Sequence, residues 1–199
     1  MAGDLAARAY AEAQTQKEVN RQAGPDLDVR VHIRSFPFIP RLLVAGQVQQ
    51  VTATASEVKE GPIAIQNLQL DLHDVRIDRR QTLNDRRLFL KSIGHGSMSG
   101  ELTSEALSQA LGFPVRVVDG GIEATVAGHT FRAEVSMKNG VLTLGAAGIT
   151  LPSLTVPIGG LLPCRPSATQ DGDLVKVSCA FTAIPSQLIQ LINGATAHG

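Results

Sequence analysis

The sequence predicts an α+β fold, in which a long, curved antiparallel β-sheet carries few helices. Alternation of apolar and polar residues with a period of two begins at Leu27 and recurs through most of the chain, as in strands with one buried face. Short turn sequences, of which Asn139-Gly140 is the strongest, separate neighbouring stretches and indicate tight antiparallel hairpins. Helical patterns are confined to a few stretches, so most of the fold is expected to be sheet.

The first expected element is a helix. Residues 4–23 contain no Gly or Pro, are rich in Ala, Gln, Glu and Arg, and end at Gly24-Pro25, a sequence that stops helices. Its apolar face is weak, so we expect this helix to pack lightly. The better members of that face are Leu5, Ala9, Ala13 and Val19.

Strands follow the helix. The longest spans residues 63–77, and a shift of the apolar phase between Ile65 and Leu68 predicts a bulge at Asn67. A break is expected near Gly94 within the stretch 86–102. The other expected strands cover residues 27–33, 47–58, 115–118, 121–126, 130–137, 141–144 and 174–182.

Two further helices are predicted by their ends. Residues 103–111 can be capped by Thr103 or Ser104, and Gly112 is typical of a helix C-terminus. Pro185 can occupy the first turn of a terminal helix over residues 185–192.

Charge and composition argue against a nucleic-acid partner. The 199 residues carry 18 Lys and Arg and 18 Asp and Glu, so the net charge is zero. Binding to a phosphate backbone favours clustered cations, and base stacking uses aromatic side chains, whereas this chain has one Tyr and no Trp. We therefore expect a core of aliphatic side chains, which suits acyl chains as well.

A long uncharged segment lies between Lys138 and Arg165. Its length would suffice for a membrane span of roughly 20 residues, but Pro152, Pro157 and Pro163 exclude a continuous helix. The segment must therefore pack in the core or face an apolar partner such as lipid, and both readings stay open. The acyl-chain candidates in it are Leu151, Leu154, Val156, Ile158, Leu161 and Leu162.

A second apolar cluster surrounds Pro37 and Pro40, within residues 35–46, which we call the Phe-Pro segment. The sequence there is too interrupted by proline for a strand. The cluster either folds over one end of the sheet as a lid on the core or contacts an acyl chain, and a lid on a lipid groove would do both. The acyl-chain candidates in this cluster are Phe36, Phe38, Ile39, Leu42 and Leu43.

Scattered cations are the candidates for a lipid head group. Arg34 and Arg41 lie on either side of Phe36-Pro37-Phe38, where they would meet a phosphate or remain solvated at a strand end. A basic cluster is expected to form a solvated hairpin or to attract an anionic lipid surface. Its members are Arg79, Arg80, Arg86, Arg87 and Lys91, with Asp78 and Asp85 among them.

The two cysteines, Cys164 and Cys179, are predicted to form a disulfide, with two buried thiols as the alternative. A loop of this length would contribute about 3 kcal/mol when closed. A disulfide would imply an oxidising compartment. The N-terminus lacks the pattern of a signal peptide, so we expect that a native export signal or anchor is absent from this sequence.

No residue pattern favours catalysis, a metal or a cofactor. Ser97 and Ser99 lie in a Gly-rich stretch that lacks the G-x-S-x-G spacing of a nucleophile elbow. Asp71, His73 and Asp78 are the candidates for a metal or acid-base group, but Asp71 and His73 share the polar face of an amphipathic strand, which favours solvated roles. We therefore predict that the chain is not an enzyme.

The order of motifs resembles a known family. Residues 29–78 are similar to the opening of the LmeA-type phospholipid-binding proteins of the actinobacterial cell envelope, and the similarity continues through SGELTSEALSQALGFPVRV and ITLPSLTVPIGGLL. The most specific element is Ser35-Phe36-Pro37-Phe38 followed by Leu42-Leu43. The cysteine pair is not part of the family pattern, so the predicted disulfide rests on the residues of this chain alone.

The resemblance implies a fold similar to tubular lipid-binding (TULIP) domains and a membrane-associated protein on the periplasmic side of the cell envelope. It implies phospholipid binding in support of mannan elongation in lipoglycan biosynthesis, with phosphatidylinositol-type lipid and an envelope glycosyltransferase as candidate partners. The expected domains are an N-terminal helix over residues 1–24, a single lipid-binding domain over 25–193 and a disordered tail over 194–199. The alternatives are an enzyme or enzyme accessory acting on lipid-linked glycan intermediates, and an envelope scaffold.

Overall fold

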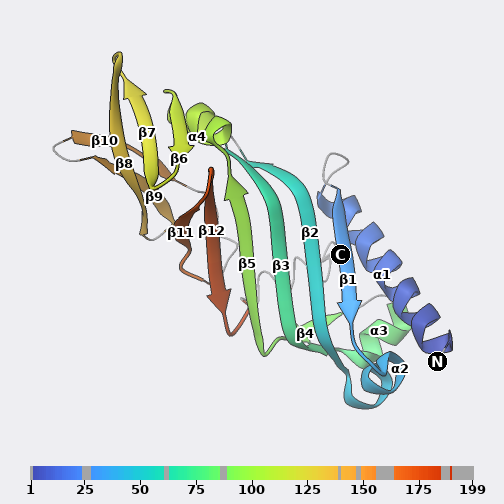
Figure 1. Cartoon of the computed structure of the whole chain (residues 1–199). Coiled ribbons are helices and arrows are strands. Elements are labelled where there is room, and N and C mark those ends of the chain that lie inside the picture. The colour runs from blue at the N-terminus through green and yellow to red at the C-terminus, as the bar shows by residue number, and fades with distance from the viewer. Residues whose placement is uncertain are drawn as a thin grey trace, which may run out of the picture. The chain divides into compact units, whose positions relative to one another are not determined.

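The computed structural model describes residues 2–23, 28–60, 63–85, 89–138, 140–146, 149–155, 164–184 and 189 (Figure 1). The helical elements are α1 (Ala2–Ala23), α2 (Phe38–Pro40), η1 (Arg41–Ala45, one turn of π-helix), α3 (Arg79–Asp85) and α4 (Ser104–Leu111). The strands are β1 (Val29–Arg34), β2 (Gln47–Glu60), β3 (Ile63–Ile77), β4 (Leu90–Ser92), β5 (His95–Leu102), β6 (Val115–Val118), β7 (Gly121–Val126), β8 (His129–Lys138), β9 (Val141–Ala146), β10 (Ile149–Thr155), β11 (Ser167–Asp171) and β12 (Leu174–Phe181).

Two sheets account for these strands. The described residues form a seven-stranded sheet in the order β1-β2-β3-β5-β12-β11, with β4 paired to β3, and a five-stranded sheet in the order β10-β9-β8-β7-β6. The pairings β1–β2, β3–β4, β6–β7, β7–β8, β8–β9, β9–β10 and β11–β12 are antiparallel. The predicted α+β class, with mostly antiparallel sheet and few helices, is confirmed.

The chain divides into two compact units. One comprises Met1–Ala55, Gln69–Ser97 and Phe181–Gly199, and the other comprises Ser56–Leu68 and Met98–Ala180. We call them unit 1 and unit 2. The division of the chain into a helix over 1–24, a single domain over 25–193 and a tail stays a prediction.

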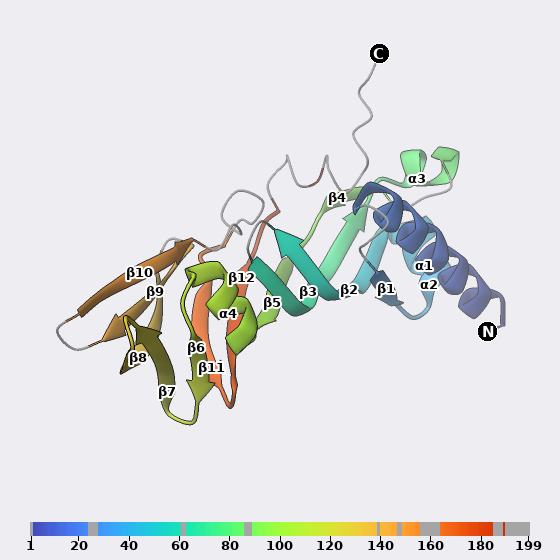
Figure 2. The same ribbon diagram turned by 90° about the horizontal axis from the view of Figure 1, so that it is seen from above.

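Unit 1 contains α1, β1, α2, η1, α3 and β4. Its strands show the alternation that the sequence predicts, since Val29, Val31 and Ile33 are buried while the intervening residues of β1 are exposed. Helix α1 runs along β1 and contacts both β1 and α2 (Figure 2). The helical elements of unit 1 therefore gather where β1 leads into the Phe-Pro segment.

Unit 2 contains the five-stranded sheet and α4. Its core joins this sheet to α4 and to β3, β5 and β12 through buried aliphatic side chains such as Leu102, Leu107 and Ile122. Both ends of helix α4 are capped as predicted. The Thr103 hydroxyl accepts a hydrogen bond from the Ala106 N–H at the N-terminus, and Gly112 adopts a left-handed conformation at the C-terminus.

Strand β3 is continuous but contains two residues with positive φ. Asn67, the position of the predicted bulge between Ile65 and Leu68, has a φ of 49°, and the bulge itself stays a prediction. Asp74 has a φ of 51° at a second shift, between the buried Leu72 and Val75, that was not predicted. Asn and Asp adopt left-handed conformations more readily than most residues, so they are suited to such positions.

Several expectations need correction. Residues 149–155 and 167–171 form β10 and β11, neither of which was predicted, and the Phe-Pro segment forms α2 and η1. Arg79 and Arg80 begin the helix α3, so the predicted solvated hairpin is wrong there. The predicted terminal helix over 185–192, apart from Ile189, and the tail over 194–199 lie outside the described residues.

The predicted disulfide is present. Cys164 and Cys179 are bonded, with their Cα atoms 5.7 Å apart, and the bond joins the residues just before β11 to β12. Neither cysteine is a free thiol. Across the described ranges, no helix is both long enough and apolar enough to cross a membrane.

Candidate functional site

Unit 1 contains an apolar cavity of about 360 Å³ between its helical elements. Ligand-binding pockets typically have volumes of ~300–1,000 Å³ and a mostly apolar lining, so this cavity has the size and character of a small binding site. The residues that line it are Ala7, Tyr10, Ala11 and Gln14 of α1, Phe38 and Ile39 of α2, Leu42 and Leu43 of η1, and Thr82 and Leu83 of α3.

The Phe-Pro segment contributes the most apolar part of the lining. Phe38 is 2% exposed and anchors the segment in the core of unit 1. Gly46 ends η1 in a left-handed conformation with φ 62°, and its N–H donates to the Leu42 carbonyl at 3.1 Å. The Gly46 carbonyl then accepts from the Ile77 N–H at 2.8 Å, which ties the end of the segment to β3.

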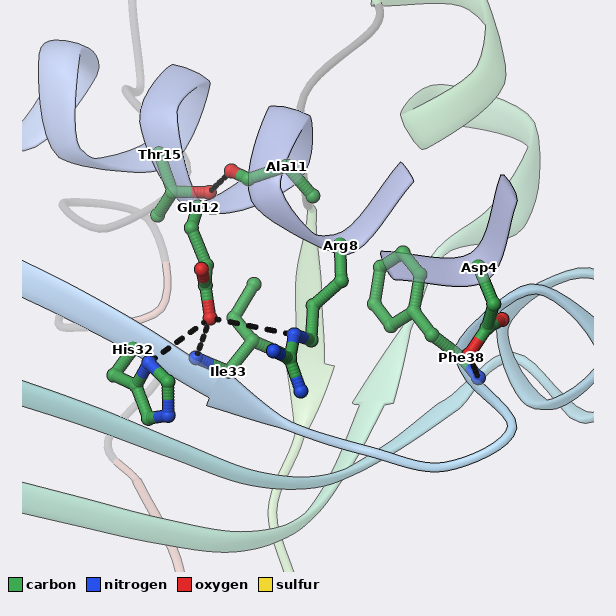
Figure 3. A network of polar contacts seen from close by, with 8 residues as sticks. All are labelled: Asp4, Arg8, Ala11, Glu12, Thr15, His32, Ile33 and Phe38. Carbon is green, nitrogen blue, oxygen red and sulfur yellow. Dashed lines mark hydrogen bonds and ion pairs between the residues drawn. The ribbon is translucent and has the colours of Figure 1, made fainter. Parts of the chain in front are cut away.

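Asp4 of α1 holds the start of α2. Its Oδ2 accepts a hydrogen bond from the Phe38 N–H at 2.9 Å, and its Oδ1 accepts from the Ile39 N–H at 2.8 Å (Figure 3 draws the contact with Phe38). These two backbone donors favour the ionised carboxylate and hold the pKa of Asp4 below its ordinary value. A side chain of α1 thus caps a helical turn that comes much later in the sequence.

Glu12 connects α1 to the edge of the sheet. Its Oε1 accepts from the Ile33 N–H at 2.6 Å and lies 3.1 Å from Nδ1 of His32 and 3.9 Å from Nε of Arg8 (Figure 3). Asn20 makes a similar contact further along α1, where its Oδ1 accepts from the Val29 N–H at 3.1 Å. Because β1 is an edge strand, these side chains satisfy backbone donors that lack a neighbouring strand.

Helix α3 completes the cavity. It begins after Asp78, whose Oδ1 accepts from the Gln81 N–H at 3.1 Å, as in an N-cap. Nη1 of Arg79 donates to the carbonyls of Leu43 at 3.1 Å and Val44 at 2.9 Å, so α3 also holds the last turn of η1. The cavity walls are therefore joined to one another by hydrogen bonds as well as by apolar contact.

Four of the five predicted acyl-chain residues of the Phe-Pro segment meet in this cavity, namely Phe38, Ile39, Leu42 and Leu43. Phe36 does not line it and is exposed on the surface. The candidates of the long uncharged segment are not brought to it by any described contact. Leu151 and Leu154 lie in β10, where the structure describes the backbone alone. The remaining candidates, Val156, Ile158, Leu161 and Leu162, lie outside the described residues.

The predicted head-group cations take different positions. Arg34 is exposed at the end of β1, whereas Arg41 is half-buried and donates from Nε to the Phe36 carbonyl at 3.1 Å. In the basic cluster, Arg79 and Arg80 lie exposed on α3 and Lys91 is exposed on β4. The other two members, Arg86 and Arg87, lie outside the described residues.

The contribution of α1 was not predicted. Of the four residues that the sequence indicated for packing, Leu5, Ala9 and Ala13 are exposed, which is a correction, and Val19 is half-buried. The side of α1 that lines the cavity carries small or polar side chains besides Tyr10, so it lacks a strong apolar signal. Its spacing of three and four residues does follow one helical stripe, which could have identified it. The residues of that stripe are Ala7, Tyr10, Ala11 and Gln14.

The polar candidates outside the cavity lie on β3 and β5 or next to them. Asp71 was expected to be solvated but is half-buried, and Thr52 donates a hydrogen bond to its Oδ1 at 2.7 Å. Burial raises the pKa of Asp71, but hydrogen bonds from Thr52, Gln69 and Gln50 lower it, and the net shift is downward.

His73 stacks on His95 with ring centroids 4.5 Å apart, and Nδ1 of His95 lies 4.0 Å from Oδ2 of Asp74. Ser97 is exposed on β5 and Ser99 is half-buried on the same strand. Within the described ranges, no group of three or more His, Cys, Asp or Glu could hold a metal ion. The prediction that the chain is not an enzyme stays a prediction.

Comparison with known proteins identifies a family. A family model described as LmeA-like phospholipid-binding matches residues 2–194. No curated protein and no solved structure matches the chain. The family match covers nearly the whole chain, including every element that lines the cavity. The chain therefore belongs to the LmeA-like phospholipid-binding family.

Proposed function

We propose that this protein binds a phospholipid without changing it chemically, and that the cavity of unit 1 holds part of an acyl chain. The observation that carries this proposal is the lining, because Phe38, Ile39, Leu42 and Leu43 face one apolar space together with α1 and α3. An apolar cavity of this kind favours a ligand that brings apolar surface of its own.

The size of the cavity sets the scale of the interaction. If a methylene group occupies the ~30 Å³ that a water molecule takes up in the liquid, about 360 Å³ accommodates on the order of ten methylenes. At ~0.8 kcal/mol for each buried methylene, the gross gain is about 8 kcal/mol, before the free energy of ordering the ligand is subtracted. This gross gain is the upper limit of what apolar burial in the cavity contributes to holding one acyl chain.

The setting of this activity is part of the proposal. We propose a tubular lipid-binding architecture and a role on the periplasmic side of the cell envelope, where the protein transfers or presents phospholipid for mannan elongation in lipoglycan biosynthesis. A phosphatidylinositol-type lipid is the proposed cargo, and an envelope glycosyltransferase is the proposed recipient. Resemblance to the family supports these points, and the disulfide between Cys164 and Cys179 supports an oxidising compartment.

Native mass spectrometry of the purified protein, incubated with mixed phospholipids in detergent, tests the proposal. The expected result is a one-to-one adduct, from which organic extraction recovers the lipid unchanged. Replacing Ala11, which lines the cavity, by Phe should fill the space and abolish the adduct. The matched variant Ala13→Phe places the same side chain on the exposed face of α1 and should keep it.

Three outcomes would contradict the proposal. Absence of an adduct with every phospholipid class would exclude acyl-chain binding and leave a scaffold. Recovery of a chemically altered lipid would show an enzyme. Equal adducts with Ala11→Phe and Ala13→Phe would place the lipid outside this cavity.

A further inference from the structure

The exposed large apolar side chains of the described residues gather on one part of the protein. All of them belong to unit 1, on α1, on α3 and on the segment that joins β1 to β2. Exposed apolar side chains are ordinary when scattered singly, but a group of them marks a surface with a partner. Leu5 lies on the side of α1 that is turned away from the cavity lining, so it is set apart from the others. We call the remaining group the apolar face; it consists of Tyr10, Phe36, Leu43, Val44 and Leu83.

The apolar face borders the cavity through three of its members. Tyr10, Leu43 and Leu83 are each exposed to solvent and also line the cavity. They come from α1, η1 and α3, so each of the helical elements that carry the exposed side chains contributes to the opening. A ligand that enters the cavity past these side chains would meet apolar surface before it reaches the interior.

Hydrogen bonds fix the backbone that carries the two most exposed side chains. Phe36 is 64% exposed and Val44 is 77% exposed. Arg41 donates to the Phe36 carbonyl and Arg79 donates to the Val44 carbonyl, while Asp4 caps the turn between them. Because the backbone is fixed on both sides, these two side chains are presented to the outside and little ordering is needed when a partner binds.

Positive charge accompanies the apolar face. Arg41 lies in η1 between Phe36 and Val44, and Arg79 and Arg80 begin α3. Within the part of the chain that the structure describes, none of the three guanidinium groups forms an ion pair with a carboxylate. The carboxylates of Asp4, in α1, and Asp78, just before α3, accept hydrogen bonds from backbone N–H groups instead.

We propose that the apolar face docks on the surface of an anionic phospholipid bilayer, so that the cavity opens directly onto lipid. Phe36 and Val44 enter the boundary between head groups and acyl chains, and Arg41 and Arg80 meet the phosphates, in the way that amphipathic surfaces bind membranes. A protein partner would account for the apolar side chains, but the cationic groups around them match anionic head groups. The inference rests on the proposed function for the role of the cavity, while docking itself depends on surface residues.

Co-sedimentation with vesicles tests the docking. Wild-type protein should bind vesicles that contain phosphatidylcholine with phosphatidylglycerol, and more weakly those of phosphatidylcholine alone. The double variant F36D/V44D should bind the anionic vesicles at least about tenfold more weakly, because two apolar contacts are lost. The control T169D/A180D adds the same charge at exposed positions of β11 and β12. It should weaken vesicle binding by less than half as much as F36D/V44D does.

The charge contribution is tested separately. Arg80→Glu should weaken binding to anionic vesicles about fivefold or more, and higher salt should reduce the difference from wild type. The control Arg116→Glu reverses a charge on the exposed side of β6, in unit 2, and should bind as the wild type does. If F36D/V44D or Arg80→Glu binds vesicles as tightly as wild type while remaining folded by circular dichroism, the proposal is overturned. F36S/V44S supplies the same test if the aspartate variant does not fold.

Failure of docking and failure of the proposed function can be told apart. F36D/V44D should still form the one-to-one adduct with phospholipid supplied in detergent, because neither side chain lines the cavity. Ala11→Phe should lose that adduct but keep vesicle binding. Vesicle binding by wild-type protein that forms no adduct would contradict the cavity as the lipid site and leave the docking face intact.

Discussion

Asp4, near the start of the first helix, caps the turn that begins with Phe38, since its carboxylate accepts the Phe38 N–H at 2.9 Å. The neighbouring Ile39 N–H is bound by the other oxygen at 2.8 Å. A carboxylate in this position satisfies donors that a helix leaves unpaired at its N-terminus. The same contact fixes α1 against the Phe-Pro segment, so it joins two walls of the cavity.

Asp4→Asn should lower the urea midpoint of unfolding at neutral pH. It should also make that midpoint change less when the pH is lowered. The folded pKa of Asp4 lies below its ordinary value of 3.8. Its stabilisation is therefore fully present above that value and is lost as the pH falls through the folded pKa. Urea titrations of wild type and variant between neutral and acidic pH measure both effects. Asp173→Asn, at an exposed turn, is the control. A variant with unchanged midpoint and unchanged acid dependence would show that the cap is not stabilising.

Glu12→Ala should destabilise the protein by about 1–3 kcal/mol, since it leaves the Ile33 N–H of the edge strand without its acceptor. Glu12→Gln keeps an acceptor oxygen and should lose less. Amide hydrogen exchange at Ile33 provides a local readout that should accelerate in the alanine variant. The control Glu134→Ala removes an exposed carboxylate from β8. Unaltered exchange at Ile33 would mean that α1 does not protect the edge of β1.

The elements that were predicted best are those with local signals. Thr103 and Gly112 mark the ends of α4 in the sequence itself, and the turn at Asp119-Gly120 joins β6 to β7 as expected. Strand β11 has no such signal, because Ser167 to Asp171 shows no apolar alternation. It becomes a strand through pairing with β12, in which Ser167 lies opposite Ser178. That pairing is a tertiary contact, which a local pattern does not contain.

The residues of the candidate site also differ in whether the local sequence indicates them. Phe38, Leu42 and Leu43 could be chosen from the sequence because large apolar residues cluster around two prolines. Ala7 and Ala11 carry little hydrophobic signal, and Asp4 reaches its partners across a separation of 34 residues. The helix wall of the cavity is therefore held in place by distant polar contacts that no local pattern indicates, although the spacing of its residues along α1 does follow one helical stripe.

Gly46→Ala should be more destabilising than an ordinary left-handed Gly→Ala change. Gly46 has a φ of 62°, and a Cβ there would lie 3.2 Å from the Ile77 carbonyl oxygen and 3.2 Å from Cγ of Arg79. The left-handed conformation alone costs about 1–2 kcal/mol for a residue with a side chain. Gly128→Ala has φ 81° and open space around the new Cβ, so it measures that conformational part. Denaturant unfolding should show a larger loss for Gly46→Ala, and equal losses would contradict the tight contact at Ile77.

The disulfide lies in unit 2, which contributes no residue to the lining of the cavity, and it should stabilise the protein. Cys164 and Cys179 are separated by 15 positions, and closing a loop of that size contributes about 3 kcal/mol by the chain-entropy argument. C164S/C179S should therefore unfold at lower urea concentration, by an amount near that value. Thiol titration of the denatured wild type should find no free thiol before reduction and should find thiols afterwards. Reducing agent should lower the stability of wild type and leave the double variant unchanged, whereas an equal response of both proteins would show that the bond does not stabilise the fold.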